Sequence, residues 1–205
     1  MALTVIDYEA GNLRSVETAL RRLGARFSIT SDAEAVRGAD RIILPGVGDA
    51  AAAMNRLRSA GLESAIDYAV GNGVPFLGIC LGSQIVLTRS EENDAVCLDL
   101  IPGTAVRFGA RAERKVPHMG WNDIRVERDH PIFYDIPVEA AFYFVHSYFP
   151  VPDDLTMVLA TTDYGESFPS VIGAANIVAT QFHPEKSGEF GLRMLSNFLA
   201  WNGGD

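Results

Sequence analysis

Cys80 stands where the apolar run 74–79 stops, with glycines two positions to either side, at Gly78 and Gly82. A side chain at the tip of a strand-to-helix turn has a strained backbone, and small neighbours at these positions leave room for it. A helix beginning near Leu81 would aim its N–H groups and positive dipole end at the sulfur and favour the thiolate. These residues predict a nucleophilic Cys80; the alternative is a buried structural cysteine.

A catalytic cysteine needs a base and a group that orients the base. His183, one of four histidines, follows the apolar run 177–182 and precedes Glu185 by two residues. In extended chain such positions face the same side, roughly 6 to 7 Å apart, which suits a carboxylate that orients an imidazole. We therefore predict a catalytic triad of Cys80, His183 and Glu185. A surface histidine followed by a solvated glutamate is the alternative for the pair taken alone.

A glycine-containing loop, residues 45–48, follows the strand predicted over residues 41–44. Glycines let a backbone approach a ligand closely and present N–H groups to a developing oxyanion. Together with the N–H of Leu81, the loop residues Gly46, Val47 and Gly48 are candidates for an oxyanion hole. A simple Pro-Gly turn is the alternative.

The first part of the chain alternates strand and helix patterns, which favours a parallel sheet covered by helices. In open sheets of this kind, chemistry takes place beyond the carboxyl ends of the strands, so Cys80 and the loop 45–48 are expected to be neighbours. The predicted strands are 3–6, 27–30, 41–44 and 74–79, and the predicted helices are 13–23, 32–37, segments up to about 71 and one after Cys80.

After about residue 90 the chain changes to short strand-like runs, which predicts a mixed or antiparallel second half. These runs are 105–108, 123–126, 141–147, 156–160 and 176–181. A final helix is expected over 187–201, with a core-facing stripe of Phe190, Met194, Phe198 and Trp201.

The composition fits one globular domain over residues 1–205, with 48% hydrophobic and 21% charged residues. A formal net charge of −9 argues against nucleic-acid partners, which are bound largely through Lys and Arg. Two cysteines, Cys80 and Cys97, make no disulfide framework, and the chain opens without a signal-peptide pattern, so we expect a cytoplasmic protein. The apolar runs break well before the roughly 18 residues of a membrane span.

Two motifs in this order, residues 78–84 and 181–185, resemble those of the class I, triad-type glutamine amidotransferases. Within that class, segments 7–16, 45–48, 115–122, 143–148 and 183–187 resemble the glutaminase subunits of imidazole glycerol phosphate synthases. The resemblance covers essentially the whole chain. It implies a flavodoxin-like α/β fold, with a mainly parallel sheet flanked by helices and further antiparallel strands in the C-terminal half.

The resemblance also implies an activity and a partner. Such a subunit hydrolyses L-glutamine without a metal or organic cofactor and passes the ammonia to a separate (β/α)8 cyclase subunit of a heterodimer in histidine biosynthesis. The resemblance implies that Gln84, Glu92, Ser147 and Tyr148 contact glutamine, with Glu92 pairing with its ammonium group. It places Asn12, Trp121, Asn122 and Lys186 near the partner interface. The alternatives are a solvated acidic loop for Glu92, sheet core for Tyr148, a core aromatic position for Trp121, and an ordinary surface position for Lys186.

Three departures from the family pattern leave the identity of the partner open. Glu9 stands where glycine is usual, Ser83 replaces a bulkier residue, and the segment 97–100 lacks the usual glycines. A relative that supplies ammonia to a sugar-modifying synthase in surface-polysaccharide biosynthesis is therefore a second possibility. A Cys-His hydrolase and a non-catalytic binding module are possibilities from other classes, but Gln84 and the intact triad residues count against them.

Overall fold

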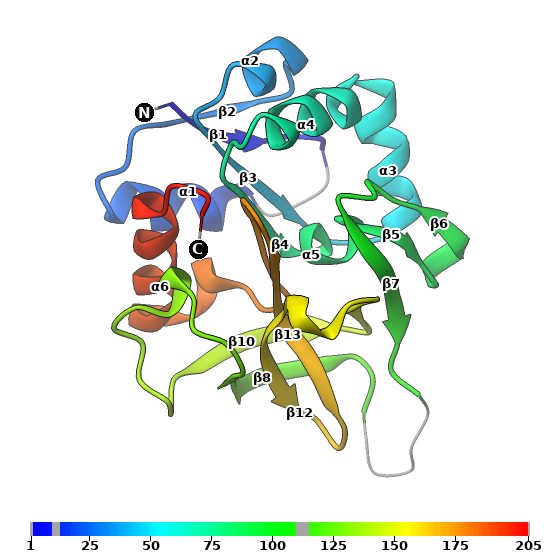
Figure 1. Ribbon diagram of the computed structural model, residues 1–205, viewed down its shortest axis with the longest axis vertical. Coiled ribbons are helices and arrows are strands. Elements are labelled where there is room, and N and C mark those ends of the chain that lie inside the picture. Colours follow the sequence, from blue (N-terminus) through cyan, green and yellow to red (C-terminus); the bar gives the residue numbers. More distant parts are fainter. Residues whose placement is uncertain (1, 10–12, 110–114, 205) are drawn as a thin grey trace.

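The computed structural model describes residues 2–9, 13–109 and 115–204, and its largest element is an eight-stranded sheet (Figure 1). The strand order is β2-β1-β3-β4-β14-β13-β12-β9. The first five strands in this order run parallel and the remaining three add antiparallel pairings. The bounds are β1 (Leu3–Ile6), β2 (Phe27–Thr30), β3 (Arg41–Gly46), β4 (Phe76–Cys80), β9 (Arg125–Val126), β12 (Val158–Asp163), β13 (Ser167–Ala174) and β14 (Ile177–Thr180).

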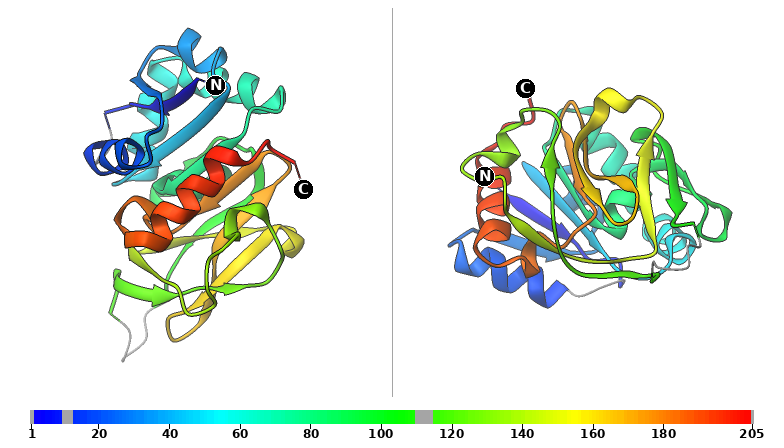
Figure 2. Two further views of the ribbon diagram at one scale, coloured as in Figure 1. Left: turned by 90° about the vertical axis from the view of Figure 1, so that its left-hand side faces the viewer. Right: turned by 90° about the horizontal axis from the view of Figure 1, so that it is seen from below.

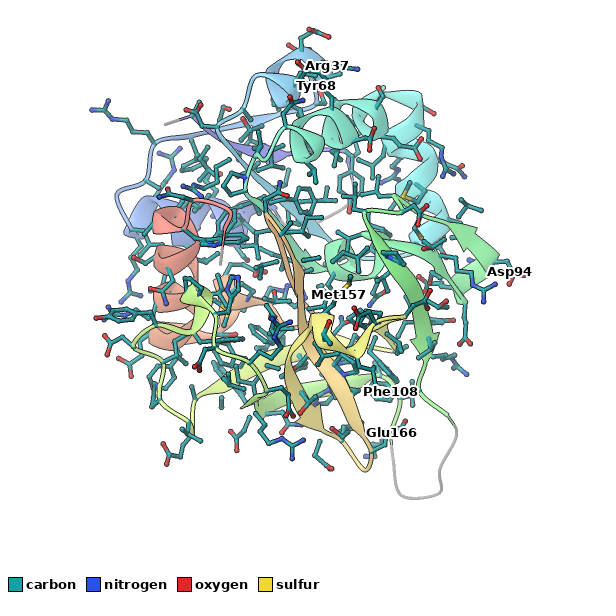
Figure 3. The ribbon with its side chains drawn as sticks, in the orientation of Figure 1. Arg37, Tyr68, Asp94, Phe108, Met157 and Glu166 are labelled. Atoms are coloured by element: carbon teal, nitrogen blue, oxygen red, sulfur yellow. The ribbon has the colours of Figure 1, made fainter. Side chains whose placement is uncertain are left out.

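Helices cover both faces of the parallel part of this sheet (Figures 1 and 2). They are α1 (Leu13–Arg22), α2 (Ala33–Arg37), α3 (Ala50–Ser59), α4 (Leu62–Gly71), α5 (Leu81–Ile85) and α6 (Gly188–Ala200). In β3, Ile43 packs with α1 and α6, while Ile42 and Leu44 pack with α2, α3 and α4. The period-two alternation of a strand thus divides the apolar residues between two cores. Between α2 and α4, the Arg37 guanidinium lies 5.2 Å from the centre of the Tyr68 ring (Figure 3).

Two smaller sheets stand beside the main sheet (Figure 1). One is an antiparallel ribbon of β8 (His118–Asp123) and β10 (Ala141–His146). The other has the order β11-β7-β5-β6, with β5 (Leu87–Ser90), β6 (Ala95–Val96), β7 (Ile101–Arg107) and β11 (Tyr148–Pro152). Short 3-10 turns are η1 (Glu92–Asp94), η2 (Pro131–Phe133), η3 (Leu155–Met157) and η4 (Pro184–Lys186).

The sequence predicts the parallel half closely and the second half less well. The run 156–160 begins as the turn η3 and becomes strand only at Val158, and the run 123–126 divides between β8 and β9 around Ile124. Strands β5, β6, β11 and β13 were not predicted. Strand β13 contains Pro169 and Gly173, which are unusual inside a strand. Pro169 is tolerated because it pairs with Thr161, where the register of β12 on β13 shifts.

Two of the departures from the family pattern fall at unusual backbone positions. Glu9 has a φ of 60° and Asp99 a φ of 54°, both in the left-handed region that favours glycine. The usual glycines at and near these positions therefore have a conformational reason. Within the described ranges, no helix combines the length and apolarity needed to cross a membrane.

Candidate active site

The turn from β4 into α5 holds Cys80 in a strained conformation, with φ 54° and ψ −106°. A Cβ atom at Gly78 would lie 2.8 Å from the carbonyl oxygen of Gly82, and one at Gly82 would clash with the carbonyl oxygen of Leu44. The geometry therefore requires glycine at both positions, as the sequence predicts. Such strain persists only where the surrounding structure enforces it, and it is commonly found at functional sites.

A cavity of about 340 Å³ opens beside this turn. Its walls come from the loop after β3, the turn from β4 into α5, η1, the residue before β8, the end of β10 and the start of β11. Seven residues proposed from the sequence for oxyanion or glutamine binding line it, in addition to Cys80. The lining residues are Val47, Gly48, Cys80, Leu81, Gln84, Glu92, Pro117, Val145, His146, Ser147 and Tyr148.

His183 and Glu185 form a buried pair, with 2.7 Å between Nδ1 and Oε1 and 3% exposure of each side chain. The expectation that this segment is extended is wrong, because the chain turns at η4 immediately after His183. Pro184 opens that turn, and its fixed φ suits the first position of a helical turn. The turn, and not the alternation of an extended strand, brings the carboxylate back onto the imidazole.

The other ring nitrogen of His183, Nε2, is buried and makes no hydrogen bond of ordinary geometry within the described part of the chain. The Cys80 thiol lies close enough to act on this ring. Burial lowers the pKa of His183, but the interactions with the Cys80 thiol and the Glu185 carboxylate outweigh burial and raise it to about 10. The site therefore favours an imidazolium at neutral pH, which is a ready proton donor.

Cys80 has a further polar neighbour, Gln181, that the sequence reasoning did not single out. The Gln181 amide donates from Nε2 to Cys80 Sγ over 3.8 Å, and Gln181 is fully buried. Its position in the motif 181–185, two residues before His183, was the available signal. The sulfur of Cys80 is thus contacted by a side chain from the strand end beside it as well as by the turn that carries it.

The loop after β3 contributes unequally to the cavity. Val47 and Gly48 line it, and Gly48 has a φ of 104° that favours glycine. Gly46 is instead the last residue of β3, where it pairs with Cys80 on β4. A Cβ atom at Gly46 would clash with the Tyr8 hydroxyl. Gly46 thus lets the strand end pack against Tyr8 and so places the two loop residues beside the sulfur.

Glu92 and Gln84 stand in the cavity wall. Burial raises the pKa of Glu92, the N–H of Ala50 opposes this by donating to its Oε2 over 2.9 Å, and Asp49 adds to the rise. A carboxylate held in this way gains from a cationic ligand. Gln84 donates from Nε2 to the carbonyl oxygen of Tyr148 over 3.0 Å.

Trp121, Tyr143 and Lys186 form a cluster in which Trp121 is exposed and the other two side chains are partly buried. The Trp121 ring meets Tyr143 edge-on with 6.1 Å between centroids, and Lys186 Nζ lies 6.0 Å from the centroid of Tyr143. Trp121 is 58% exposed, which excludes the core position considered from the sequence. Asn122 turns inward and donates to the carbonyl oxygen of Asp163, so its interface role stays a prediction. Asn12 lies outside the described residues.

Comparison with known proteins identifies the family. The family model for glutamine amidotransferase class-I matches residues 4–201. Imidazole glycerol phosphate synthase subunit HisH of Nitrosococcus oceani is 48% identical over 98% of this chain and 98% of that protein. The HisH subunit of Halobacterium salinarum is 50% identical over 97% of this chain and 92% of that protein.

Solved structures agree on the fold. A putative GMP synthase component of Thermoplasma acidophilum has a TM-score of 0.73 at 23% identity, covering 98% of this chain and 92% of that chain. PurLQS of Thermotoga maritima has a TM-score of 0.72 at 19% identity, with 97% of each chain covered. The predicted fold class and family resemblance are thus confirmed. The chain belongs to the class-I glutamine amidotransferase family and, within it, to the group of HisH subunits of imidazole glycerol phosphate synthase.

Proposed function

We propose that this chain acts as one glutaminase domain over residues 1–205, with Cys80, His183 and Glu185 as its catalytic triad. The observation that carries the proposal is the strained Cys80 in the wall of the cavity, beside a buried imidazole that Glu185 holds at 2.7 Å. Strain, a raised histidine pKa and a cavity at one place are typical of a nucleophile with its acid-base partner.

In the proposed reaction, the Cys80 thiolate attacks the side-chain amide carbon of glutamine. The carbon–nitrogen bond breaks while the His183 imidazolium gives its proton to the nitrogen, which leaves as ammonia. The resulting glutamyl thioester is attacked by a water whose proton goes to the now neutral His183. The thioester bond breaks, glutamate leaves, and the thiolate and imidazolium are restored.

The cavity supplies groups for the rest of the substrate. In this proposal the N–H groups of Leu81, Val47 and Gly48 stabilise the oxyanion. Gly46, which the sequence also suggested for this role, positions the loop from the end of β3. Glu92 pairs with the α-ammonium group, because its partly buried carboxylate carries the complementary charge. The remaining contacts with glutamine come from Gln84, Ser147 and Tyr148.

The ammonia needs a protected route, because in water it would be protonated and lose its nucleophilicity. The relatives reported above are named as subunits of imidazole glycerol phosphate synthase. We therefore propose a cytoplasmic heterodimer with a (β/α)8 cyclase subunit, docked over Trp121 and Lys186, with Asn12 and Asn122 nearby. An exposed aromatic ring beside a cation fits the anchor residues of interfaces. The same names disfavour a partner from polysaccharide synthesis.

The first test is covalent labelling of the full chain by an electrophilic glutamine analogue, read by mass spectrometry. The second test measures glutamate release with and without the cyclase partner and its nucleotide substrate. We expect labelling at Cys80, protection by glutamine, and strong stimulation of glutamate release by the liganded partner. Cys80→Ser should abolish both readouts, whereas the matched Cys97→Ser should leave them unchanged. Labelling that glutamine does not prevent would contradict a glutaminase site, and equal rates with and without the partner would contradict the heterodimer.

A further inference from the structure

Two histidines outside the proposed triad, His118 and His146, are buried opposite each other on the ribbon of β8 and β10. His118 Nδ1 lies 3.0 Å from His146 Nε2. His146 Nδ1 lies 2.8 Å from the carbonyl oxygen of Tyr148. The rings therefore form consecutive links of one hydrogen-bonded chain.

Asn122 fixes the outer end of this chain. Its Oδ1 accepts the N–H of Asp123 at 2.9 Å, and its Nδ2 donates to the carbonyl oxygen of Asp163 at 2.8 Å. These two bonds determine which way the amide faces. The second hydrogen on Nδ2 is then directed to His118 Nε2, 3.3 Å away.

The carbonyl oxygen of Tyr148 fixes the inner end, because it can only accept. His146 must therefore carry its proton on Nδ1, and its Nε2 is left as an acceptor. His118 must in turn donate from Nδ1, and its Nε2 accepts from Asn122. One arrangement of protons satisfies every link: both rings are neutral, both are in the Nδ1–H tautomer, and all donors point from Asn122 toward Tyr148.

The surroundings support neutral rings. Burial lowers the pKa of His118 to about 4. Burial also lowers the pKa of His146 to about 3, against the hydrogen bond to Tyr148. The His118 ring stacks on Tyr164, with 4.0 Å between centroids, and Phe108 packs 5.2 Å from His146 (Figure 3 marks Phe108 beyond the end of β7). An added proton on either ring would set one N–H against another.

The chain ends in the wall of the cavity. The carbonyl oxygen of Tyr148 also accepts from Gln84 Nε2. Gln84 Nε2 donates to Gln181 Oε1 over 3.1 Å, which leaves Gln181 Nε2 to donate to Cys80 Sγ. The direction of each amide thus depends on the link before it. A reversed Gln84 amide would place two oxygens together or turn an oxygen of Gln181 toward the sulfur.

We propose that His118 and His146 are positioning residues for glutamine binding. As a relay of two neutral imidazoles, they hold the carbonyl oxygen of Tyr148 and so the orientation of the Gln84 amide in the cavity wall. This inference rests on the proposed glutaminase function. It gives the buried pair a role distinct from that of His183, which moves protons.

The first test is the tautomeric state of each histidine in the full wild-type chain, measured by long-range nitrogen–proton NMR at pH 7.5 and assigned with single-histidine variants. We expect neutral Nδ1–H rings at His118 and His146 and a charged ring at His183. His130 is an internal reference for the opposite neutral tautomer, because its Nδ1 accepts the N–H of Ile132 at 3.1 Å. A charged ring or an Nε2–H tautomer at His118 or His146 would overturn the proposal.

The second test compares two substitutions of His146 in the complex with the cyclase partner. The amide nitrogen of His146→Asn stands where Nδ1 stood and keeps the donor to Tyr148, whereas His146→Leu removes it. We expect His146→Leu to raise the KM for glutamine about 10-fold, with kcat changed less than about threefold, because a hydrogen bond that orients the binding wall is lost. His146→Asn should stay within about threefold of the wild-type KM.

Equal KM values for the two variants, or a loss confined to kcat, would contradict a positioning role. If His146→Leu does not fold, His118→Phe serves instead, because it keeps the ring stack but removes the donor to His146. An increase in KM is again expected, and an unchanged KM would overturn the proposal. A wild-type chain that hydrolyses no glutamine would instead refute the proposed function, and the NMR result would be unaffected.

Discussion

Two buried histidine regions lie close together in this molecule, and one favours a positively charged ring whereas the other favours neutral rings. At the turn after β14, the pKa of His183 is raised to about 10, whereas on the ribbon of β8 and β10 the pKa values of His118 and His146 are lowered to about 4 and about 3. All three side chains are almost completely buried, so burial does not explain the difference.

The difference lies in the partners. His183 interacts with the Glu185 carboxylate and with Cys80, and both favour a positively charged ring. His118 and His146 instead contact each other, the side-chain amide of Asn122 and the carbonyl oxygen of Tyr148. An anionic partner compensates the loss of hydration of an imidazolium, and a neutral relay does not. One residue type is therefore favoured as a charged ring in one region and as a neutral, hydrogen-bonded ring in the other.

Replacing the carboxylate should weaken this contrast and should have the largest effect. Glu185→Gln keeps the shape of the pair, but it leaves Cys80 as the partner that raises the pKa of His183 and allows the wrong ring tautomer. We expect kcat/KM for glutamine hydrolysis to fall by at least about 100-fold, as when the carboxylate of a related triad is replaced by an amide. Glu189→Gln, an exposed position in α6, makes the same change of charge and should leave kcat/KM unchanged. Equal activities of the two variants would contradict the role of Glu185.

The pH dependence of stability sharpens the comparison, because the two regions have opposite signs. Unfolded histidines take up protons near pH 6.5, whereas folded His118 and His146 do so only near pH 4 and pH 3. The contribution of these two rings to the free energy of unfolding is therefore lost as the pH falls through this window. His183 binds its proton more tightly when folded, so its contribution is complete below pH 6.5 and is lost as pH rises through about 10.

Urea unfolding of the wild type, His118→Phe and His183→Gln across this range checks the signs. We expect His118→Phe to reduce the loss of unfolding free energy between pH 6.5 and 4, and His183→Gln to reduce the loss between pH 6.5 and 10. Curves parallel to that of the wild type in both variants would show that these rings are not linked to folding as described.

The smallest effect is expected where the two regions are joined. Ser187 Oγ donates to the carbonyl oxygen of His183 over 2.6 Å and accepts the N–H of Tyr143 from β10 over 2.9 Å. Ser187→Ala leaves two buried backbone groups without this partner and should lower the unfolding free energy by about 1–3 kcal/mol. Ser59→Ala removes an exposed hydroxyl in α3 and is the control. A Ser187→Ala variant as stable as the control would show that the two regions are not coupled through this side chain.

Much of the parallel half and the elbow at Cys80 could be predicted from local sequence. The alternation of Ile42, Ile43 and Leu44 and the glycines around Cys80 act within a few residues of where they stand. The motifs also predicted the close pairing of His183 with Glu185, although through the wrong backbone conformation. Strand β13 was missed although its partners β12 and β14 are its neighbours in the sequence, because it contains Pro169 and Gly173. The contacts of Gln181 with Cys80 and of His146 with His118 were missed because the two partners of each contact lie far apart in the sequence.

The sequence alone determined which groups are capable of chemistry here: a cysteine between obligatory glycines, a histidine two residues before a glutamate, and the family to which they belong. Only the tertiary structure decided the charge of each imidazole and the direction of each amide. The physical reason is that hydrogen-bond polarity and pKa depend on the groups that meet a side chain in space. For His118 and His146 those groups are supplied by other strands and loops, whose arrangement no local pattern records.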